Sequence, residues 1–343
     1  MTLASTTPEV LRPGNTPREQ KARRLRKIVG GVGVRLVQVV PTLILASIII
    51  FSLQMLIPGD AATALAGDDA SASTIEALRE QLGLNQPVWV QFWNWFSNVL
   101  QGNLGTSAVT GVSVNQIMAE RLPVTLMITA ASMVVMAVVG IPLGIVAALR
   151  RNTKVDAFVT GLSTLGLAIP SFWLGMVLIL VFSISLGMFP AIGFVSPFED
   201  PVEGLRSLAL PAVALGFTGA AEAAQQTRSA MIEVLDSDAM RTHRAKGLSG
   251  TSIVFRHALK NAGIPIVTIM GLRLSEVIGG SVVIETLFAL PGIGSVVMLA
   301  ITQRDFVIVQ AVVLITVLLV MVTNLLVDLI YLVVDPRMSS GKG

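Results

Sequence analysis

The sequence predicts an all-α membrane protein with six transmembrane helices. Three properties of the 343 residues predict this class: the mean hydropathy is +0.77, 53% of the residues are hydrophobic, and only 13% are charged. A soluble domain usually carries about 25% charged residues, so this composition argues against a cytosolic enzyme. Several apolar runs are long enough to cross a hydrocarbon core of roughly 30 Å. The sequence has no cysteine, which excludes disulfides and thiolate metal sites.

Hydropathy places the six spans at 34–57, 122–149, 157–187, 207–228, 262–287 and 306–334. The first span is expected to remain as an anchor, because its apolar run from Leu36 to Ile57 is too long for a cleavable signal peptide. Pro170 allows a break in the third span. The expected divisions are a basic cytoplasmic tail (1–33), the first transmembrane helix (34–57), an extracytoplasmic helical segment (58–121), a five-helix core (122–334) with a cytoplasmic loop (229–261), and a cytoplasmic C-terminal tail (335–343).

The distribution of lysine and arginine predicts the orientation in the membrane. With the N-terminus in the cytoplasm, 19 of the 24 basic residues fall on the cytoplasmic side and four on the outer side. This asymmetry follows the positive-inside rule, and six spans return the C-terminus to the cytoplasm. We expect the basic residues before the first span to be attracted to anionic lipid of the bilayer rather than to nucleic acid.

Catalytic motifs are absent from the sequence. It contains no P-loop of the form G-x-x-x-x-G-K-[ST] and no G-x-S-x-G nucleophile turn. Its two histidines, His243 and His257, leave little basis for a histidine metal centre. We therefore expect no catalytic residues, no metal site and no cofactor in this chain.

The outer segment is predicted to form two short helices. Ser73-Thr74-Ile75-Glu76 fits a capping box, and Gly83 suits the end of the helix that it starts. Pro87 opens a second helix, on which one apolar face carries Trp89, Phe92, Trp93, Phe96 and Leu100. Two interpretations stay open, namely a small subdomain packed on the ends of the spans and a platform that receives a delivery protein.

The inner segment is predicted to form two capped helices that meet at a glycine. Asp236-Ser237-Asp238 offers N-cap residues for a helix over 239–246, and Gly247 followed by Leu248 fits a Schellman stop. Ser249 caps a second helix over 251–261. The unit is too small for a core of its own, so we expect it to dock on another surface.

Fragments spread over about 30–338 resemble one family of transport proteins. In the inner segment they are Arg241-Thr242, Ala245-Lys246-Gly247-Leu248, Arg256-His257-Ala258-Leu259-Lys260-Asn261-Ala262 and Ile264-Pro265. Elsewhere they include Leu82-Gly83-Leu84-Asn85-Gln86-Pro87, Arg121-Leu122-Pro123, Ile169-Pro170-Ser171-Phe172-Trp173, Glu285-Thr286-Leu287-Phe288 and Pro291-Gly292-Ile293-Gly294. Their order and spacing resemble the binding-protein-dependent ABC importer permeases, in the dipeptide, oligopeptide and nickel branch. His243 departs from the family, which usually has a small residue there.

The resemblance implies a translocation subunit for di- or oligopeptides in a prokaryotic cell membrane. It implies as partners a second homologous permease subunit, two ATPase subunits that hold ATP and Mg, and an extracytoplasmic substrate-binding protein. The inner segment would be the EAA-type loop, whose coupling helix sits in a cleft on the ATPase. The residues implied in ATPase coupling are Asp238, Arg241, Thr242, His243, Arg244, Ala245, Lys246, Gly247 and Leu248.

Two charged residues near the middle of the fifth span are candidates for the translocation pathway. Arg273 and Glu276 are three residues apart, so they share a helix face. Charges at this depth are costly unless they are paired or hydrated. One interpretation is an ion pair that locks the span to a neighbour, and the other is a pathway lining that meets the charged termini of a peptide. Glu222 and Glu285 are placed near span ends, within reach of water.

Three alternatives to a peptide importer stay open. A nickel or metal-chelate importer would use the same architecture. A stand-alone secondary transporter would need no ATP, and an intramembrane enzyme would need paired catalytic groups at matching depth, which Arg273, Glu276, Asn324 and Asp328 do not evidently form.

Overall fold

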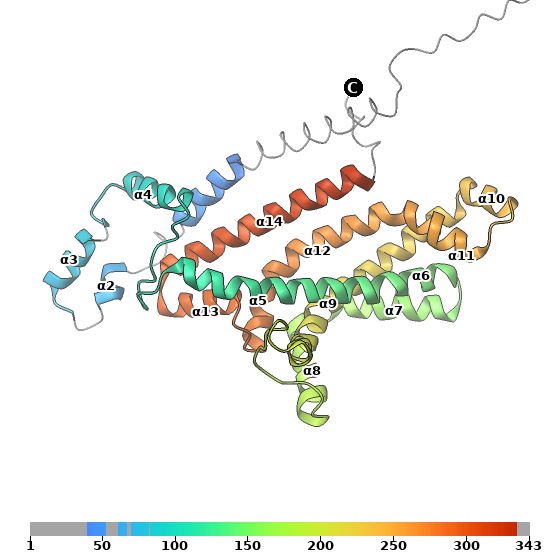
Figure 1. The fold of residues 1–343 in the computed structure, drawn as a ribbon, viewed down its shortest axis with the longest axis horizontal. Helices are drawn as coiled ribbons and strands as arrows, with labels where there is room; N and C mark the ends of the chain where they lie inside the picture. Colours follow the sequence, from blue (N-terminus) through green and yellow to red (C-terminus); the bar gives the residue numbers. More distant parts are fainter. Residues whose placement is uncertain (1–39, 53–60, 67–69, 82, 335–343) are drawn as a thin grey trace, which may run out of the picture.

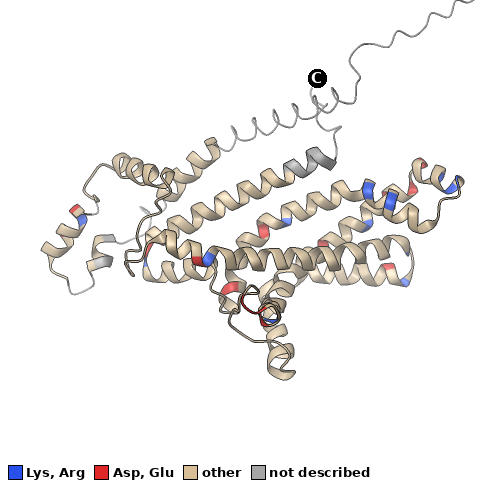
Figure 2. Cartoon of the chain, viewed as in Figure 1, with Lys and Arg blue, Asp and Glu red and all other residues tan. Residues whose placement is uncertain are grey.

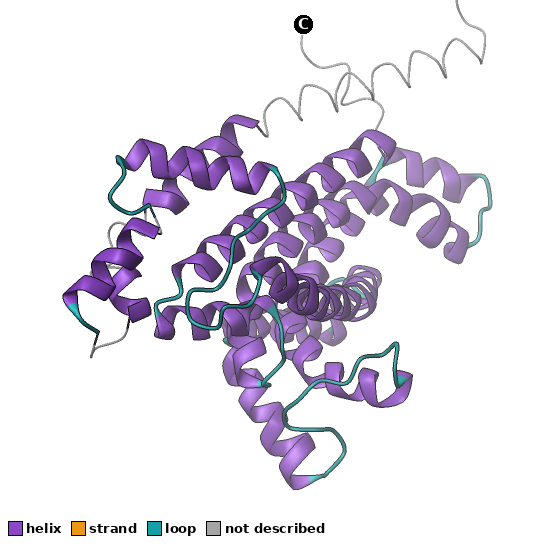
Figure 3. Cartoon of the chain, turned by 60° about the vertical axis from the view of Figure 1, so that its left-hand side comes forward, coloured by secondary structure: helices purple, strands orange, loops and turns teal. Residues whose placement is uncertain are grey.

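The computed structural model describes residues 40–52, 61–66, 70–81 and 83–334. Four long helices run side by side along the long axis of the molecule (Figure 1). They are α5 (Val114–Val135), α9 (Pro201–Asp236), α12 (Leu259–Leu287) and α14 (Phe306–Val334). The described residues form no β-strand beyond one isolated bridge between Thr106 and Ser113, as Figure 3 also shows. The all-α prediction is therefore confirmed.

Four helices of the described chain are long and apolar enough to cross a membrane, namely Val114–Leu149, Pro201–Asp236, Gly250–Leu287 and Phe306–Val327. They contain or overlap the predicted second, fourth, fifth and sixth spans. Two of them include π-helical turns: η1 (Met136–Gly140) joins α5 to α6 (Ile141–Leu149), and α11 (Gly250–Ser252) and η3 (Ile253–Ala258) precede α12. The first predicted span is described only over its helix Val40–Ser52, and both predicted tails lie outside the described residues.

The third predicted span is broken next to Pro170, as the sequence allows. α7 (Lys154–Ala168) and the helix formed by α8 (Ser171–Leu178) and η2 (Ile179–Ser185) meet at an angle of 102°. Ile169 is extended, with ψ 120°, because the ring of Pro170 disfavours the helical conformation in the residue before it. α8 therefore projects away from the bundle in Figure 1.

Helix α9 extends beyond its predicted span at both ends, and its first turn is well capped. The carboxylate of Asp200 accepts hydrogen bonds from the backbone N–H of Val202 (3.0 Å) and Glu203 (3.1 Å), and Pro201 occupies the first helical position. The helix then runs for 36 residues to Asp236. α9 contacts α5, α6, α7, α8 and α12, so it is the central helix of the bundle.

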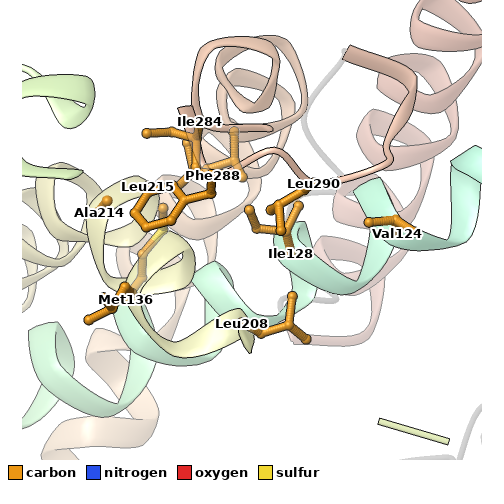
Figure 4. Close-up of a cluster of buried hydrophobic side chains, with 11 residues drawn as sticks. Val124, Ile128, Met136, Leu208, Ala214, Leu215, Ile284, Phe288 and Leu290 are labelled. Atoms are coloured by element: carbon orange, nitrogen blue, oxygen red, sulfur yellow. The ribbon is translucent and has the colours of Figure 1, made fainter. Parts of the chain in front are cut away.

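Apolar side chains from α5, α9 and α12 form the main core (Figure 4). Ile128, Leu215 and Ile284 meet there, and Phe288 is almost fully buried. Beside this core, α9 approaches η1 and α6 closely along small residues. A β-carbon placed on Gly140 would lie 2.5 Å from the carbonyl oxygen of Ala220, and one on Gly144 would lie 2.5 Å from that of Ala224. Small residues that allow such close approach are typical of helix packing in membranes.

The outer segment contains α2 (Ala61–Ala66), α3 (Ala72–Gln81) and α4 (Val88–Leu100). The predicted capping box at Ser73 is wrong: α3 begins at Ala72, and Ser71 lies before it, with its hydroxyl accepting from the N–H of Thr74 at 3.2 Å. Gly83 has φ +69°, as expected for a helix stop. On α4, Phe92 and Trp95 contact Phe51 of the first helix, whereas Trp89 and Trp93 stay exposed.

Candidate coupling helix and translocation pathway

Helix α10 (Asp238–Ala245) lies at the end of the molecule opposite to α2, α3 and α4 (Figure 1). Ser237 separates it from α9 by adopting an extended conformation with φ −69° and ψ 153°. The predicted side-chain cap does not form, because the Ser237 hydroxyl donates to the carbonyl of Val234 at 2.6 Å. Asp238 still occupies the first turn, where a carboxylate suits the helix dipole.

The predicted Schellman stop of α10 is confirmed. Gly247 has φ +76°, its N–H donates to the carbonyl of Arg244 (3.0 Å), and the N–H of Leu248 donates to that of His243 (3.3 Å). The hydroxyl of Ser249 then accepts from the N–H of Ser252 at 3.4 Å and caps the next helix. The chain thus turns sharply at one left-handed residue.

The second inner helix does not end at Asn261 as predicted. It continues through η3 and α12 as one helix, Gly250–Leu287. Gly263 and Pro265 lie inside it and do not mark the start of a separate span. The turn after α10 is therefore joined without a break to the helix that carries Arg273 and Glu276.

A single buried side chain anchors α10 to the bundle. Met240 is 1% exposed and belongs to an apolar cluster with Ile145, Met231, Ile253 and Ile266. His243 is half-buried and stacks on His257 of η3, with ring centroids 4.2 Å apart. Sequence reasoning missed this anchor, although Met240 is the only apolar residue of bulk within α10.

The other candidate coupling residues form an exposed surface on α10 and the turn after it. They are Asp238, Arg241, Thr242, Arg244, Ala245, Lys246, Gly247 and Leu248. Figure 2 shows charged residues gathered at this end of the molecule. Arg241 pairs with Asp238 at 3.2 Å, and Arg244 donates to the carbonyl of Leu235 at 3.1 Å. The helix therefore presents a polar, cation-rich surface, while Met240 on its other side packs against the bundle.

Arg273 binds two carboxylates. Its guanidinium pairs with Glu276 on the same helix, as the spacing predicts, and also with Glu222 on α9. Glu222, which was predicted to lie near a span end, is on the long helix α9, where Arg273 bridges to it. Arg273 and Glu222 are 22% and 29% exposed in their side chains, and Glu276 is 61% exposed. Arg273 therefore links α9 to α12, and the carboxylate of Glu276 stays largely exposed although it is paired.

A polar face runs along α9 past this cluster toward α10. It carries Thr218, Glu222, Gln226, Ser229 and Glu233, which recur every three or four residues and are half-buried or exposed. Such a face is unusual in a helix that is otherwise 72% buried over its most apolar part. Polar residues within membrane spans line protein interiors or water-filled cavities. Their recurrence is visible in the sequence, but without the packing it does not show which side stays open.

Asp156 and Glu285, two of the buried carboxylates outside this face, have structural partners. Asp156 on α7 forms a bidentate pair with Arg228 on α9, at 2.5 and 2.7 Å. Glu285 was expected to be within reach of water but is fully buried. It accepts from the Thr125 hydroxyl (2.7 Å) and from the N–H groups of Gly294 (2.7 Å) and Ser295. These groups start α13 (Ile293–Gln303), so Glu285 fixes that helix against α5.

The described residues contain no group of three or more His, Asp or Glu side chains that could hold a metal ion. A bundle of four long apolar helices defines a membrane protein with several spans. The chain belongs to the family of binding-protein-dependent transport system inner membrane components, whose model matches residues 140–340, while the model of the family's N-terminal region matches residues 31–129. The resemblance seen in the sequence is thereby confirmed.

Similar proteins agree with this assignment. A putative peptide transport system permease protein of Brucella abortus is 42% identical over 304 residues, covering 89% of this chain and 97% of the relative. The glutathione transport system permease protein GsiC of Escherichia coli O6:H1 is 40% identical over 302 residues, covering 88% and 96%. The fold is similar to that in the inward facing MetNI methionine ABC transporter, with a TM-score of 0.52, 21% identity, and coverage of 64% of this chain and 97% of that chain.

Proposed function

We propose that this chain is one of two permease subunits of an ABC importer that moves di- or oligopeptides across a prokaryotic plasma membrane. An extracytoplasmic binding protein delivers the peptide, and two separate ATPase subunits, which hold ATP and Mg, supply the energy. The chain itself carries no ATPase site. The peptide and glutathione names of relatives at 42% and 40% identity support this cargo over nickel or a metal chelate.

The observation that carries the proposal is the construction of α10. It is exposed except for Met240 and half-buried His243, it ends at a left-handed glycine, and it lies between two long helices. Such a helix can receive a movement from a docked ATPase and pass it to α9 and α12. The polar face of α9, with Arg273 and Glu276, is the candidate pathway that this movement opens and closes.

The proposed orientation puts α10 in the cytoplasm, which the distribution of basic residues supports. With α10 in the cytoplasm, the outer segment α2–α4 lies at the opposite end of the bundle, where a binding protein would dock. Both termini are then cytoplasmic, as the distribution of basic residues predicts.

The contact with the ATPase is tested by cross-linking in the assembled transporter. The chain has no cysteine, so Ala245→Cys introduces a single thiol beside the turn at Gly247. We expect a short thiol-to-amine cross-linker to join this position to an ATPase subunit. Val202 is 70% exposed and lies at the start of α9, whereas α10 follows the end of that helix. Val202→Cys is therefore the matched control and should not cross-link. Equal cross-linking of both positions would contradict the coupling assignment.

The cargo and the energy source are tested in proteoliposomes. The complete assembly should take up peptides only with ATP and binding protein. Uptake of nickel instead of peptide would replace the proposed cargo, and ATP-independent uptake would identify a secondary transporter.

A further inference from the structure

One face of α12 is exposed along several turns and carries a charge. Leu272, Glu276, Gly279 and Val283 recur every three or four residues and are all exposed. A β-carbon placed on Gly279 would meet no atom within 4 Å. We call this surface the open face of α12. It lies beside the polar face of α9, because Arg273 links the two helices through Glu222.

The open face of α12 is unsuited to lipid. A carboxylate that is 61% exposed near the middle of a span is strongly unfavourable in hydrocarbon. One side of α14 provides a contrast, since Leu318, Val322 and Leu326 recur there every four residues, are exposed and apolar, and suit a lipid surface. The exposed Asn324 lies on a different side of that helix. Glu276 therefore requires water or a polar ligand in front of it.

The charge balance of this cluster is negative. Arg273 is shared by Glu222 and Glu276, so the three groups together carry one excess negative charge. Arg228, the nearest cation along α9, is occupied by a bidentate bond to Asp156. Glu233 adds a further exposed carboxylate to the polar face of α9. Among the described residues of these two faces, the unbalanced charges are acidic.

We propose that Glu276 is a specificity-determining contact that receives cationic groups of the cargo, above all the ammonium group of a lysine side chain. Glu222 neutralises Arg273, so the arginine holds Glu276 in position without cancelling both carboxylates. The ammonium of a passing peptide then meets an unbalanced carboxylate in a partly desolvated path, where the attraction is stronger than in bulk water. This inference rests on the proposed function as a peptide permease.

A reporter thiol next to Glu276 tests the sign of this surface without any cargo. Gly279→Cys lies on the same face, and the chain has no other cysteine. In the assembled transporter we expect a quaternary-ammonium methanethiosulfonate to label it faster than a sulfonate methanethiosulfonate, after correction for their rates with a free thiol. Adding Glu276→Gln should lower this corrected ratio about fivefold, because one negative charge close to the thiol is lost. Glu276→Asp should retain the ratio.

The labelling has outcomes that overturn the inference. A ratio unchanged by Glu276→Gln would show that the carboxylate does not govern the local field. A Gly279→Cys thiol inert to both reagents would show that this face is covered by a subunit or lipid. Val322→Cys on the apolar side of α14 is the control that should remain unlabelled.

Transport provides the second readout. At saturating binding protein, Glu276→Gln should lower the uptake of Ala-Lys-Ala relative to Ala-Glu-Ala by about fivefold. An unchanged ratio of uptake would contradict the role in cargo selection. Failure of the wild-type assembly to take up any peptide would instead reject the proposed function. The labelling would still report the sign of the charge on the open face of α12.

Discussion

At the scale of single residues, the backbone conformation of Gly247 matters more than the free space around it. A β-carbon there would meet nothing within 4 Å, so a larger residue fits sterically, but φ is +76°. Gly247→Val is therefore expected to strain the turn by about 1–3 kcal/mol and to misdirect α10. In proteoliposomes, ATP hydrolysis should continue while peptide uptake falls.

The matched variant is Gly247→Asn, because asparagine tolerates the left-handed conformation better than valine. It should keep most of the uptake. If both variants transported peptides at the wild-type rate, the conformation of Gly247 would have no part in coupling.

Glu285 is the second residue with a sharp expectation. Glu285→Leu would leave the N–H groups of Gly294 and Ser295 and the hydroxyl of Thr125 without their buried acceptor. An unsatisfied buried donor costs about 1–3 kcal/mol, so thermal unfolding in detergent should occur at clearly lower temperature. Glu276→Leu removes an exposed carboxylate and should change the unfolding temperature much less. Equal effects would contradict the role of Glu285 in fixing α13.

At the scale of elements, the contact between α6 and α9 depends on glycine. Gly144→Leu would push a side chain into the carbonyl of Ala224 and the β-carbon of Thr227, at 2.5 and 2.6 Å from the added β-carbon. Overpacking of this kind costs about 1–3 kcal/mol or more, and the amount of folded protein in the membrane should fall. Gly161→Leu on α7, where nothing lies within 4 Å, should accumulate at the wild-type level. Normal accumulation of Gly144→Leu would show that the helices can separate freely.

The elements differ in how far the sequence predicts them. Hydropathy finds the long helices because a span must be apolar over its whole length, and Gly247 and Ser249 reveal the turn because few residues suit those positions. Hydropathy does not predict the 102° angle at Pro170, because the number of apolar residues says nothing about the direction in which the chain continues. The second partner of Arg273 could not be predicted from the sequence either, because Glu222 is 51 residues away and only packing brings α9 beside α12.

At the scale of the whole molecule, α10 and the outer segment lie at opposite ends of the bundle. An impermeant maleimide added to intact cells should therefore label Ser97→Cys on α4 and leave Ala239→Cys on α10 unlabelled. Both positions are exposed in the chain, so accessibility within the protein does not separate them. Permeabilised cells should show labelling at both positions. Labelling of Ala239→Cys in intact cells would reverse the proposed orientation.

The burial of Met240 has a consequence for how the bundle moves. Its neighbours Ile145, Met231 and Ile253 come from α6, α9 and η3, which leads into α12. A displacement of α10 that left these neighbours behind would empty a space the size of a side chain, at about 2–5 kcal/mol. The ends of three long helices nearest α10 therefore have to shift together, and a push on one exposed turn is divided among them from the outset.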